Sequence, residues 1–254
     1  MLVRHLTKQL SCLKKTFNMK TGKTELKFGL YATLSLVILT IITWGFGMIA
    51  VPPAGPYCPG DCMSYPFQDI LSYYPRDYYW MYVSIFQLFA YVIFIVSIHF
   101  IAPIEKKLFS FISVAFALIS AIVLLIAYFV QFSVVPASVM NGEMDGIALL
   151  TQYNGHGIFI AMEDLGYITM SISFLFLAFI FSMKNRLTKS IRLILLMAFV
   201  LTVLSFVFYS IKFGIDRSYR FEVAAISINW LVTITAGILI CIFLKNRLKT
   251  INLI

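Results

Sequence analysis

Charged side chains are scarce in this sequence. Asp, Glu, Lys and Arg together make up 12% of the 254 residues, while hydrophobic residues make up 61%. Soluble domains carry about 25% charged and roughly 45–50% apolar residues. A chain of this length cannot hide so much apolar surface in a water-soluble core. The composition therefore excludes a soluble fold and indicates that lipid is the solvent.

Motifs of catalysis and cofactor binding are also missing. The sequence has no His-Glu-x-x-His zinc motif, no Gly-x-Ser-x-Gly nucleophile elbow and no complete Gly-x-x-x-x-Gly-Lys-Ser/Thr phosphate loop. Histidine is rare, and we expect His99 and His156 at opposite faces of the membrane, which disfavours a haem site. We predict no cofactor and no metal, and the sequence does not decide whether the protein is an enzyme.

The hydrophobic residues are grouped in six long runs. A membrane-spanning helix needs about 20 mostly apolar residues, whereas strands of a β-barrel would give alternating segments of about ten. The sequence therefore predicts an all-α fold, a polytopic integral membrane bundle of about six helices. The expected spans are Phe28–Ala50, Tyr79–Ile101, Leu108–Val130 (extending at most to Val135), Gly157–Ser182, Ile191–Ile211 and Glu222–Leu244.

Positive charge is divided unevenly between the two ends of these runs. Most of the 20 Lys and Arg residues fall in the N-terminal tail, the second and fourth connections and the C-terminal tail, and most acids fall in the other loops. Basic residues collect on the cytoplasmic side of membrane proteins. We therefore expect a multi-pass protein of the cell membrane with both termini in the cytoplasm.

The expected organisation has three parts. A basic cytoplasmic tail at residues 1–27 precedes a transmembrane domain at 28–245, and a short basic tail follows at 246–254. The outer loops at 51–78 and 136–156 are the longer ones. A net charge of +9 would suggest nucleic acid for a soluble protein, but no basic domain exists outside the spans. We expect membrane lipids and not nucleic acid as partners, and the sequence indicates no oligomeric state.

The N-terminal tail carries an apolar stripe with basic residues between its members. At spacings of three and four, this stripe is typical of an amphipathic helix lying on an anionic membrane surface. The alternative is that translation begins at Met19. The stripe consists of Leu2, Leu6, Leu10, Leu13 and Phe17.

Two of the four cysteines share the first outer loop, as Cys58-Pro59-Gly60-Asp61-Cys62. Pro-Gly favours a turn that would bring the two sulfurs together, and disulfides persist outside the cytoplasm. We predict a structural disulfide. The alternatives are a redox-active pair, which usually has Cys-x-x-Cys spacing, and a metal site, for which the loop lacks histidine.

Two acidic residues fall inside a membrane run. Glu163 and Asp164 lie roughly 9–10 Å along the fourth expected helix. A carboxylate at this depth costs free energy and turns towards a partner or a water-filled cavity. Helical spacing places His156, Glu163 and Tyr167 on nearly one face. We predict that these residues and Asp164 bind a ligand.

Other runs carry polar residues near the same depth, while their inner halves are almost wholly apolar. Gln87, Gln131, Lys212 and Asn229 complete the predicted ligand-binding site. This distribution indicates a cavity that opens outward and is closed below by apolar packing. Alternatively, the polar residues only hold helices together, for example through an ion pair between Lys212 and one of the two acids.

The sequence leaves three functions open. A cavity favours a protein that binds or transports a small organic or lipid-like solute. Acid/base or metal-ligand roles for Glu163, Asp164 and His156 would instead make the protein an intramembrane enzyme acting on a lipid. If the polar residues are only helix contacts, the protein is a structural membrane subunit.

Overall fold

Six long helices dominate the computed structural model, which describes residues 22–50 and 54–252. Within these residues there is no strand, and six helices are long and apolar enough to cross a membrane. The all-α membrane bundle predicted from the sequence is thereby confirmed. The helices are α2 (Lys23–Ile49), α3 (Tyr79–Ile101), α4 (Lys107–Ser133), α7 (Ile158–Ala178), α8 (Arg186–Phe213) and α9 (Tyr219–Asn252).

The apolar runs locate the helices better than they locate the helix ends. α3 has the predicted bounds, but α2 and α8 each begin five residues before the apolar run does. α9 begins at Tyr219 and continues past the apolar run to Asn252. Lysine, arginine and leucine have similar helix propensities. The backbone therefore stays helical beyond the end of the apolar run.

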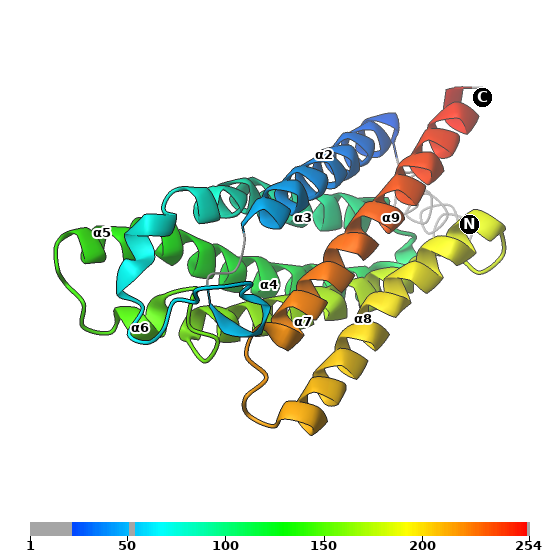
Figure 1. Ribbon diagram of the computed structural model, residues 1–254. Helices are drawn as coiled ribbons and strands as arrows, with labels where there is room; N and C mark the ends of the chain where they lie inside the picture. Colours follow the sequence, from blue (N-terminus) through cyan, green and yellow to red (C-terminus); the bar gives the residue numbers. More distant parts are fainter. Residues whose placement is uncertain (1–21, 51–53, 253–254) are drawn as a thin grey trace, which may run out of the picture.

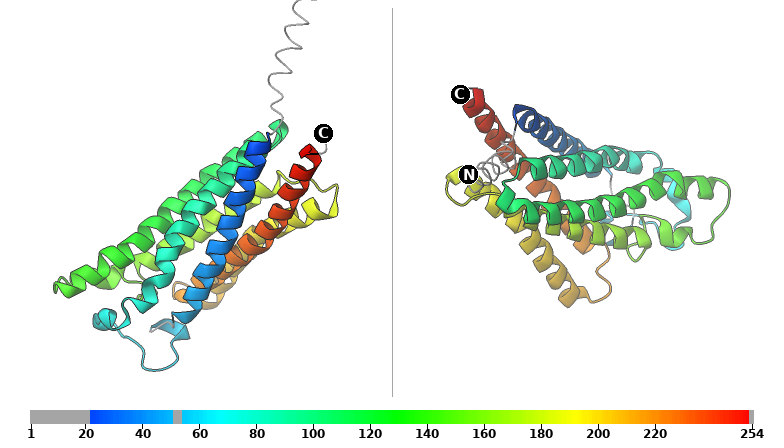
Figure 2. Two further views of the ribbon diagram at one scale, coloured as in Figure 1. Left: turned by 90° about the horizontal axis from the view of Figure 1, so that it is seen from above. Right: turned by 180° about the vertical axis from the view of Figure 1, so that it is seen from behind.

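Five of the helices form a closed ring (Figures 1 and 2). α2 packs against α3, α3 against α4, α4 against α7, α7 against α9, and α9 against α2. α8 packs against α7 and α9 from outside the ring. The start of α2 and the end of α9 lie at the same end of the bundle (Figure 2). We call the opposite end the distal end.

Small side chains bring α4 and α7 together. Ser113 Oγ donates to the Ser173 carbonyl oxygen at 2.9 Å, and Ser173 Oγ donates to the Ser113 carbonyl oxygen at 2.8 Å. Ser120 Oγ donates to the Gly166 carbonyl oxygen at 2.8 Å. A Cβ at Gly166 would lie 2.5 Å from two atoms of Leu124. Serine and glycine at this interface allow the close approach that packs membrane helices.

The distal end is built from loops with short helical segments. The loop between α2 and α3 contains three 3-10 helices and a disulfide between Cys58 and Cys62, whose Cα atoms are 5.9 Å apart. The loop between α4 and α7 contains α5 (Val135–Met140) and α6 (Ile147–Leu150). The amphipathic helix predicted for residues 2–17, and the alternative start at Met19, lie outside the described residues.

Candidate functional site

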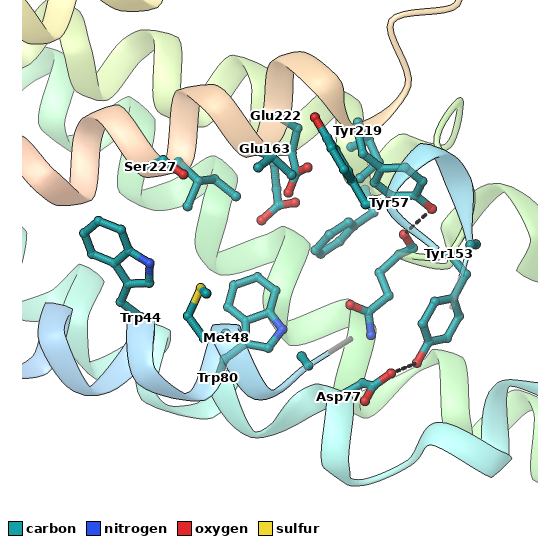
Figure 3. Close-up of a pocket in the computed structure, with 18 of the residues that line it drawn as sticks. Trp44, Met48, Tyr57, Asp77, Trp80, Tyr153, Glu163, Tyr219, Glu222 and Ser227 are labelled. Carbon is teal, nitrogen blue, oxygen red and sulfur yellow. Dashed lines mark hydrogen bonds between the residues drawn. The ribbon is translucent and has the colours of Figure 1, made fainter. Parts of the chain in front are cut away.

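The distal end contains a cavity of about 200 Å³. It lies inside the ring, with walls from α2, α3, α7 and α9 and from the loops around Tyr57, Asp77 and Gln152 (Figure 3). Drug-sized ligands occupy pockets of about 300–1,000 Å³. This cavity therefore suits a smaller molecule or one group of a larger molecule.

Two glycines set the positions at which α7 and α9 begin. A Cβ at Gly157 would lie 2.8 Å from the Leu149 carbonyl oxygen, and a Cβ at Gly155 would collide with the Ser218 side chain. Only a residue without Cβ allows the loop before α7 to approach both neighbours so closely. The loop in turn accepts a hydrogen bond from the Tyr219 hydroxyl at 3.0 Å. These contacts fix the first turns of both helices.

Two glutamates enter the cavity from the first two turns of these helices. Glu163 comes from α7 and Glu222 from α9, and their carboxyl groups are neighbours (Figure 3). Glu163 is 0% exposed and Glu222 is 8% exposed. Within the described residues, neither carboxyl oxygen of Glu163 has a hydrogen-bond partner, and Oε2 of Glu222 has none. Buried polar atoms are nearly always paired, so this pair points to a partner that the chain does not supply.

The wall of the cavity offers these glutamates no positive charge. Its lining residues, as far as the structure describes them, include no lysine, arginine or histidine. The third acid of the wall, Asp77, already has a cation, because its Oδ1 lies 2.7 Å from Arg76 Nε. A buried ion without a counter-ion costs several kcal/mol (order of magnitude). The two glutamates are therefore the groups that a bound cation would stabilise.

All three tryptophans of the sequence line the cavity. Trp44 comes from α2, Trp80 from α3 and Trp230 from α9. The ring centroids of Trp44 and Trp230 are 6.3 Å apart, and those of Trp80 and Trp230 are 6.4 Å apart. Trp44 and Trp80 lie on one side of the cavity, and Tyr57 and Tyr153 lie towards the other (Figure 3).

The tyrosines of the loops act as hydroxyl donors. Burial raises the pKa of Tyr57 and, more strongly, the pKa of Tyr153, which the neighbouring Tyr78 and Asp77 raise further. Both hydroxyls therefore stay protonated at neutral pH, since an unperturbed tyrosine already titrates near about 10. The Tyr153 hydroxyl donates to Asp77 Oδ2 at 3.5 Å.

The cavity reaches the surface between α2 and α9. Three of its lining residues are exposed, namely Met48 (75%), Tyr57 (45%) and Val223 (40%). Met48 lies near the last turn of α2, and Val223 lies in the first turns of α9. The lining therefore runs from an open mouth at the distal end to the fully buried Glu163.

Three of the ligand-binding residues predicted from the sequence lie at or beneath the cavity. Glu163 lines it. The ring of Tyr167 lies 6.5 Å from the ring of Trp230, and its hydroxyl is hydrogen-bonded to the Tyr128 hydroxyl at 2.9 Å. Asn229 Nδ2 donates to the Tyr167 carbonyl oxygen at 3.3 Å. Tyr167 and Asn229 support the cavity without lining it.

Three other predicted residues lie elsewhere. Asp164 points away from Glu163, and its Oδ2 lies 3.9 Å from Arg217 Nη2. His156 is largely exposed and its Nε2 lies 2.8 Å from Asp216 Oδ1. α7 begins only at Ile158, so the helical spacing does not extend back to His156. The expected common face therefore holds Glu163 and Tyr167 but not the histidine.

Lys212 is the third of these residues. Its Nζ lies over the rings of Phe208, at 5.8 Å, and Phe213, at 5.4 Å. Among the described residues it forms no ion pair with Glu163 or Asp164. The suggested ion pair is wrong: Asp164 faces Arg217 instead, and the ammonium group of Lys212 lies over two phenylalanine rings.

The two predicted glutamines hold neighbouring segments. Gln87 Nε2 donates to Thr40 Oγ1 at 3.1 Å and so joins α3 to α2. Gln131 Nε2 donates to the Leu150 carbonyl oxygen, and its Oε1 accepts from the Gln152 backbone N–H at 2.8 Å. Gln131 therefore fixes the loop whose next residues line the cavity.

Glu222 and the tryptophans are the site residues that sequence reasoning missed. Glu222 lies at the edge of an apolar run, where an acidic residue is common and does not indicate a binding site. The helix in fact begins at Tyr219, and this places Glu222 inside its first turn. The available signal was that all three tryptophans lie near expected distal helix ends.

Comparisons of this chain with protein-family models, curated proteins and solved structures gave no match.

Proposed function

We propose that this protein binds a small organic solute in the distal cavity. The observation that carries the proposal is the pair of Glu163 and Glu222, two neighbouring buried carboxyl groups that face the same cavity, where no basic side chain of the described residues lines the wall. A polar residue that only joins helices would be satisfied by them, as Gln131 is through both ends of its side chain. The glutamates of the cavity are not satisfied in this way.

The orientation of the cavity is part of the proposal. The connections at the end of the bundle that holds the termini carry Lys106, Lys107, Lys184 and Arg186, whereas the distal loops carry most of the acids. The preference of basic residues for the cytoplasmic side supports cytoplasmic termini and a cavity that opens outward at the cell membrane. The solute would then arrive from the external medium or from the outer leaflet.

The lipid-enzyme alternative loses its main argument. It needed His156 beside Glu163 and Asp164 as an acid/base or metal-ligand set. The His156 side chain contacts Asp216 instead, and Asp164 faces Arg217. A set of three that is not assembled cannot perform proton transfer to one substrate.

Two glycines of α2 provide a matched test. Gly47 lines the cavity, and a Cβ there would meet only the Trp230 ring, at 3.8 Å. Gly45 has nothing within 4 Å of such a Cβ. Gly47→Leu therefore fills the cavity without a backbone clash, whereas Gly45→Leu adds the same side chain outside it.

The measurement is a thermal-stability screen of the purified protein against cationic, neutral and anionic small solutes. A bound solute raises stability by RT ln(1 + [L]/Kd), or about 2.7 kcal/mol at 100 times Kd. We expect at least one class to raise the Tm of the wild type and of Gly45→Leu, and not of Gly47→Leu. If no class raises the Tm of the wild type, the protein has no solute site in this cavity. The same conclusion follows if every class that raises the Tm of the wild type raises the Tm of Gly47→Leu equally.

A further inference from the structure

We infer that the solute carries an organic cation, a substituted ammonium group about the size of trimethylammonium. This inference rests on the proposed function and names the chemical class of its ligand. The ammonium group would lie against the carboxyl groups of Glu163 and Glu222, with its alkyl groups against the tryptophans. Charge and aromatic lining each support this class.

Charge selects a cation. The two glutamates come from different helices, so the fold brings two acids together inside a ring of apolar helices. Two neighbouring carboxyl groups repel each other when both are ionised, and a cation between them removes the repulsion. An anionic ligand would add a third negative charge. The described lining contains no basic residue to receive it.

The aromatic lining selects an organic cation over a metal ion. Calcium takes about 6–8 oxygen ligands, and the free carboxyl oxygens here belong to only two residues. Trp44, Trp80 and Trp230 instead line the cavity with aromatic rings, and tryptophan is the best aromatic partner for a cation. Aromatic surroundings combined with a carboxylate are the arrangement that binds quaternary ammonium groups. The cavity has both components on adjacent walls.

The mouth of the cavity admits two sources of the same group. Met48 and Val223 are exposed at the distal ends of α2 and α9, which are ends of two candidate membrane spans. The ammonium group therefore comes either from a soluble amine or from the headgroup of a choline lipid. Both sources share the chemistry that the glutamates and tryptophans would recognise.

The test uses tryptophan fluorescence, because every tryptophan of the chain lines the cavity. The full-length protein, purified in maltoside micelles, is titrated separately with choline, with its neutral carbon isostere 3,3-dimethylbutan-1-ol and with dioctanoyl phosphatidylcholine. The same titrations are made on Glu163→Gln, on Glu222→Gln and on Glu143→Gln. Glu143 is an exposed loop residue and serves as the matched control.

We expect choline to change the fluorescence at a concentration at least about tenfold lower than the neutral isostere does, because only choline carries a charge that the two carboxyl groups attract. Glu163→Gln and Glu222→Gln should abolish this preference and leave the response to the neutral isostere unchanged. Glu143→Gln should behave like the wild type. A response to the choline lipid at lower concentration than to choline identifies the headgroup as the source, and the reverse order identifies a soluble amine.

Two results overturn the inference. One is equal binding of choline and its neutral isostere. The other is no response to choline or to its lipid at about 50 mM, far above the roughly 1 mM of a weak specific site. If a neutral or anionic solute still stabilises the wild type but not Gly47→Leu, the proposed function survives and only the ligand class is wrong. If no solute does, both fail.

Discussion

Asp77 and Glu163 are both buried acids that line one cavity, but they differ in the polar groups that surround them. Asp77 has an arginine at 2.7 Å and a tyrosine donor at 3.5 Å. Glu163 has neither. The first arrangement is that of a residue that stabilises the fold. The second is typical of a residue that binds a group from outside the chain. An unpaired buried acid lowers stability, so the fold alone gives no reason for its presence.

This difference predicts opposite effects of two neutralising substitutions. Asp77→Asn removes the charge that Arg76 faces. Since Arg76 is about half exposed, the loss of stability should be about 1–2 kcal/mol. Glu163→Gln replaces a buried carboxyl group that has no hydrogen-bond partner among the described residues, and it should leave the free energy of unfolding unchanged or raise it. Thermal unfolding of the purified ligand-free variants in detergent measures both.

A control separates this account from the ion-pair alternative. Lys212→Met combined with Glu163→Gln should give the sum of the two single effects, because the side chains are not in contact. A Glu163→Gln variant that loses as much stability as Asp77→Asn would make Glu163 a structural residue.

At the residue scale, the sequence reveals polar or charged residues that occur where apolar residues are expected. Glu163 is visible because a carboxyl group interrupts an apolar run. Glu222 is not, because it stands where a run begins and any acid is acceptable there. The place of His156 depended on assuming that the helix starts before it. The loop glycines Gly155 and Gly157 delay that start, and no periodicity reports their contacts.

The α4–α7 interface shows how elements are positioned. Its hydrogen bonds between serines are individually weak, about 0.6 kcal/mol on average in membrane helices. Close packing contributes more, and Gly166 is the closest point, facing the buried side chain of Leu124. α7 carries Glu163, so the depth and rotation of the glutamate depend on this interface.

The interface predicts a pair of compensating substitutions. Gly166→Ala should destabilise the protein by about 1–3 kcal/mol, because overpacking forces the helices apart. Leu124→Ala alone should destabilise it as well, by leaving a cavity. In the double variant the new methyl group occupies part of that cavity, so the loss should be smaller than the sum. Unfolding of the three variants in detergent measures the coupling, and strict additivity would refute this account of the interface.

At the scale of elements the sequence is most informative. Six apolar runs predict six helices because each run is long enough to span and has few charges. The ends of α8 and α9 are not predictable in the same way, since good helix formers follow the apolar residues. The ring itself, with α8 outside it, depends on contacts between runs, and hydrophobicity alone does not encode these.

The whole molecule places most of its basic residues and its cavity at opposite ends. Basic residues collect around the termini, and the cavity with its two glutamates lies at the distal end. In the proposed orientation, with cytoplasmic termini, the cavity opens to the outside. A negatively charged cleft with apolar walls also concentrates cations at its mouth, by about 10- to 1,000-fold in favourable cases.

Ser227 allows the external access of the cavity and its preference for cations to be measured in one experiment, because Ser227 lines the cavity on α9. Ser227→Cys is made in a chain whose Cys12 and Cys241 are replaced by alanine. Intact cells are then treated with one of two impermeant thiosulfonates, one carrying trimethylammonium and the other sulfonate. Glu143→Cys in the same background gives the reactivity ratio of an exposed thiol in a distal loop.

The account predicts that Ser227→Cys is labelled from outside, with a preference for the cationic reagent at least about tenfold above that of Glu143→Cys. Added choline should slow the labelling of Ser227→Cys and leave Glu143→Cys unaffected. The contradicting result is a Ser227→Cys protein that reacts only after the cells are permeabilised, or that reacts from outside with the same cation-to-anion ratio as Glu143→Cys.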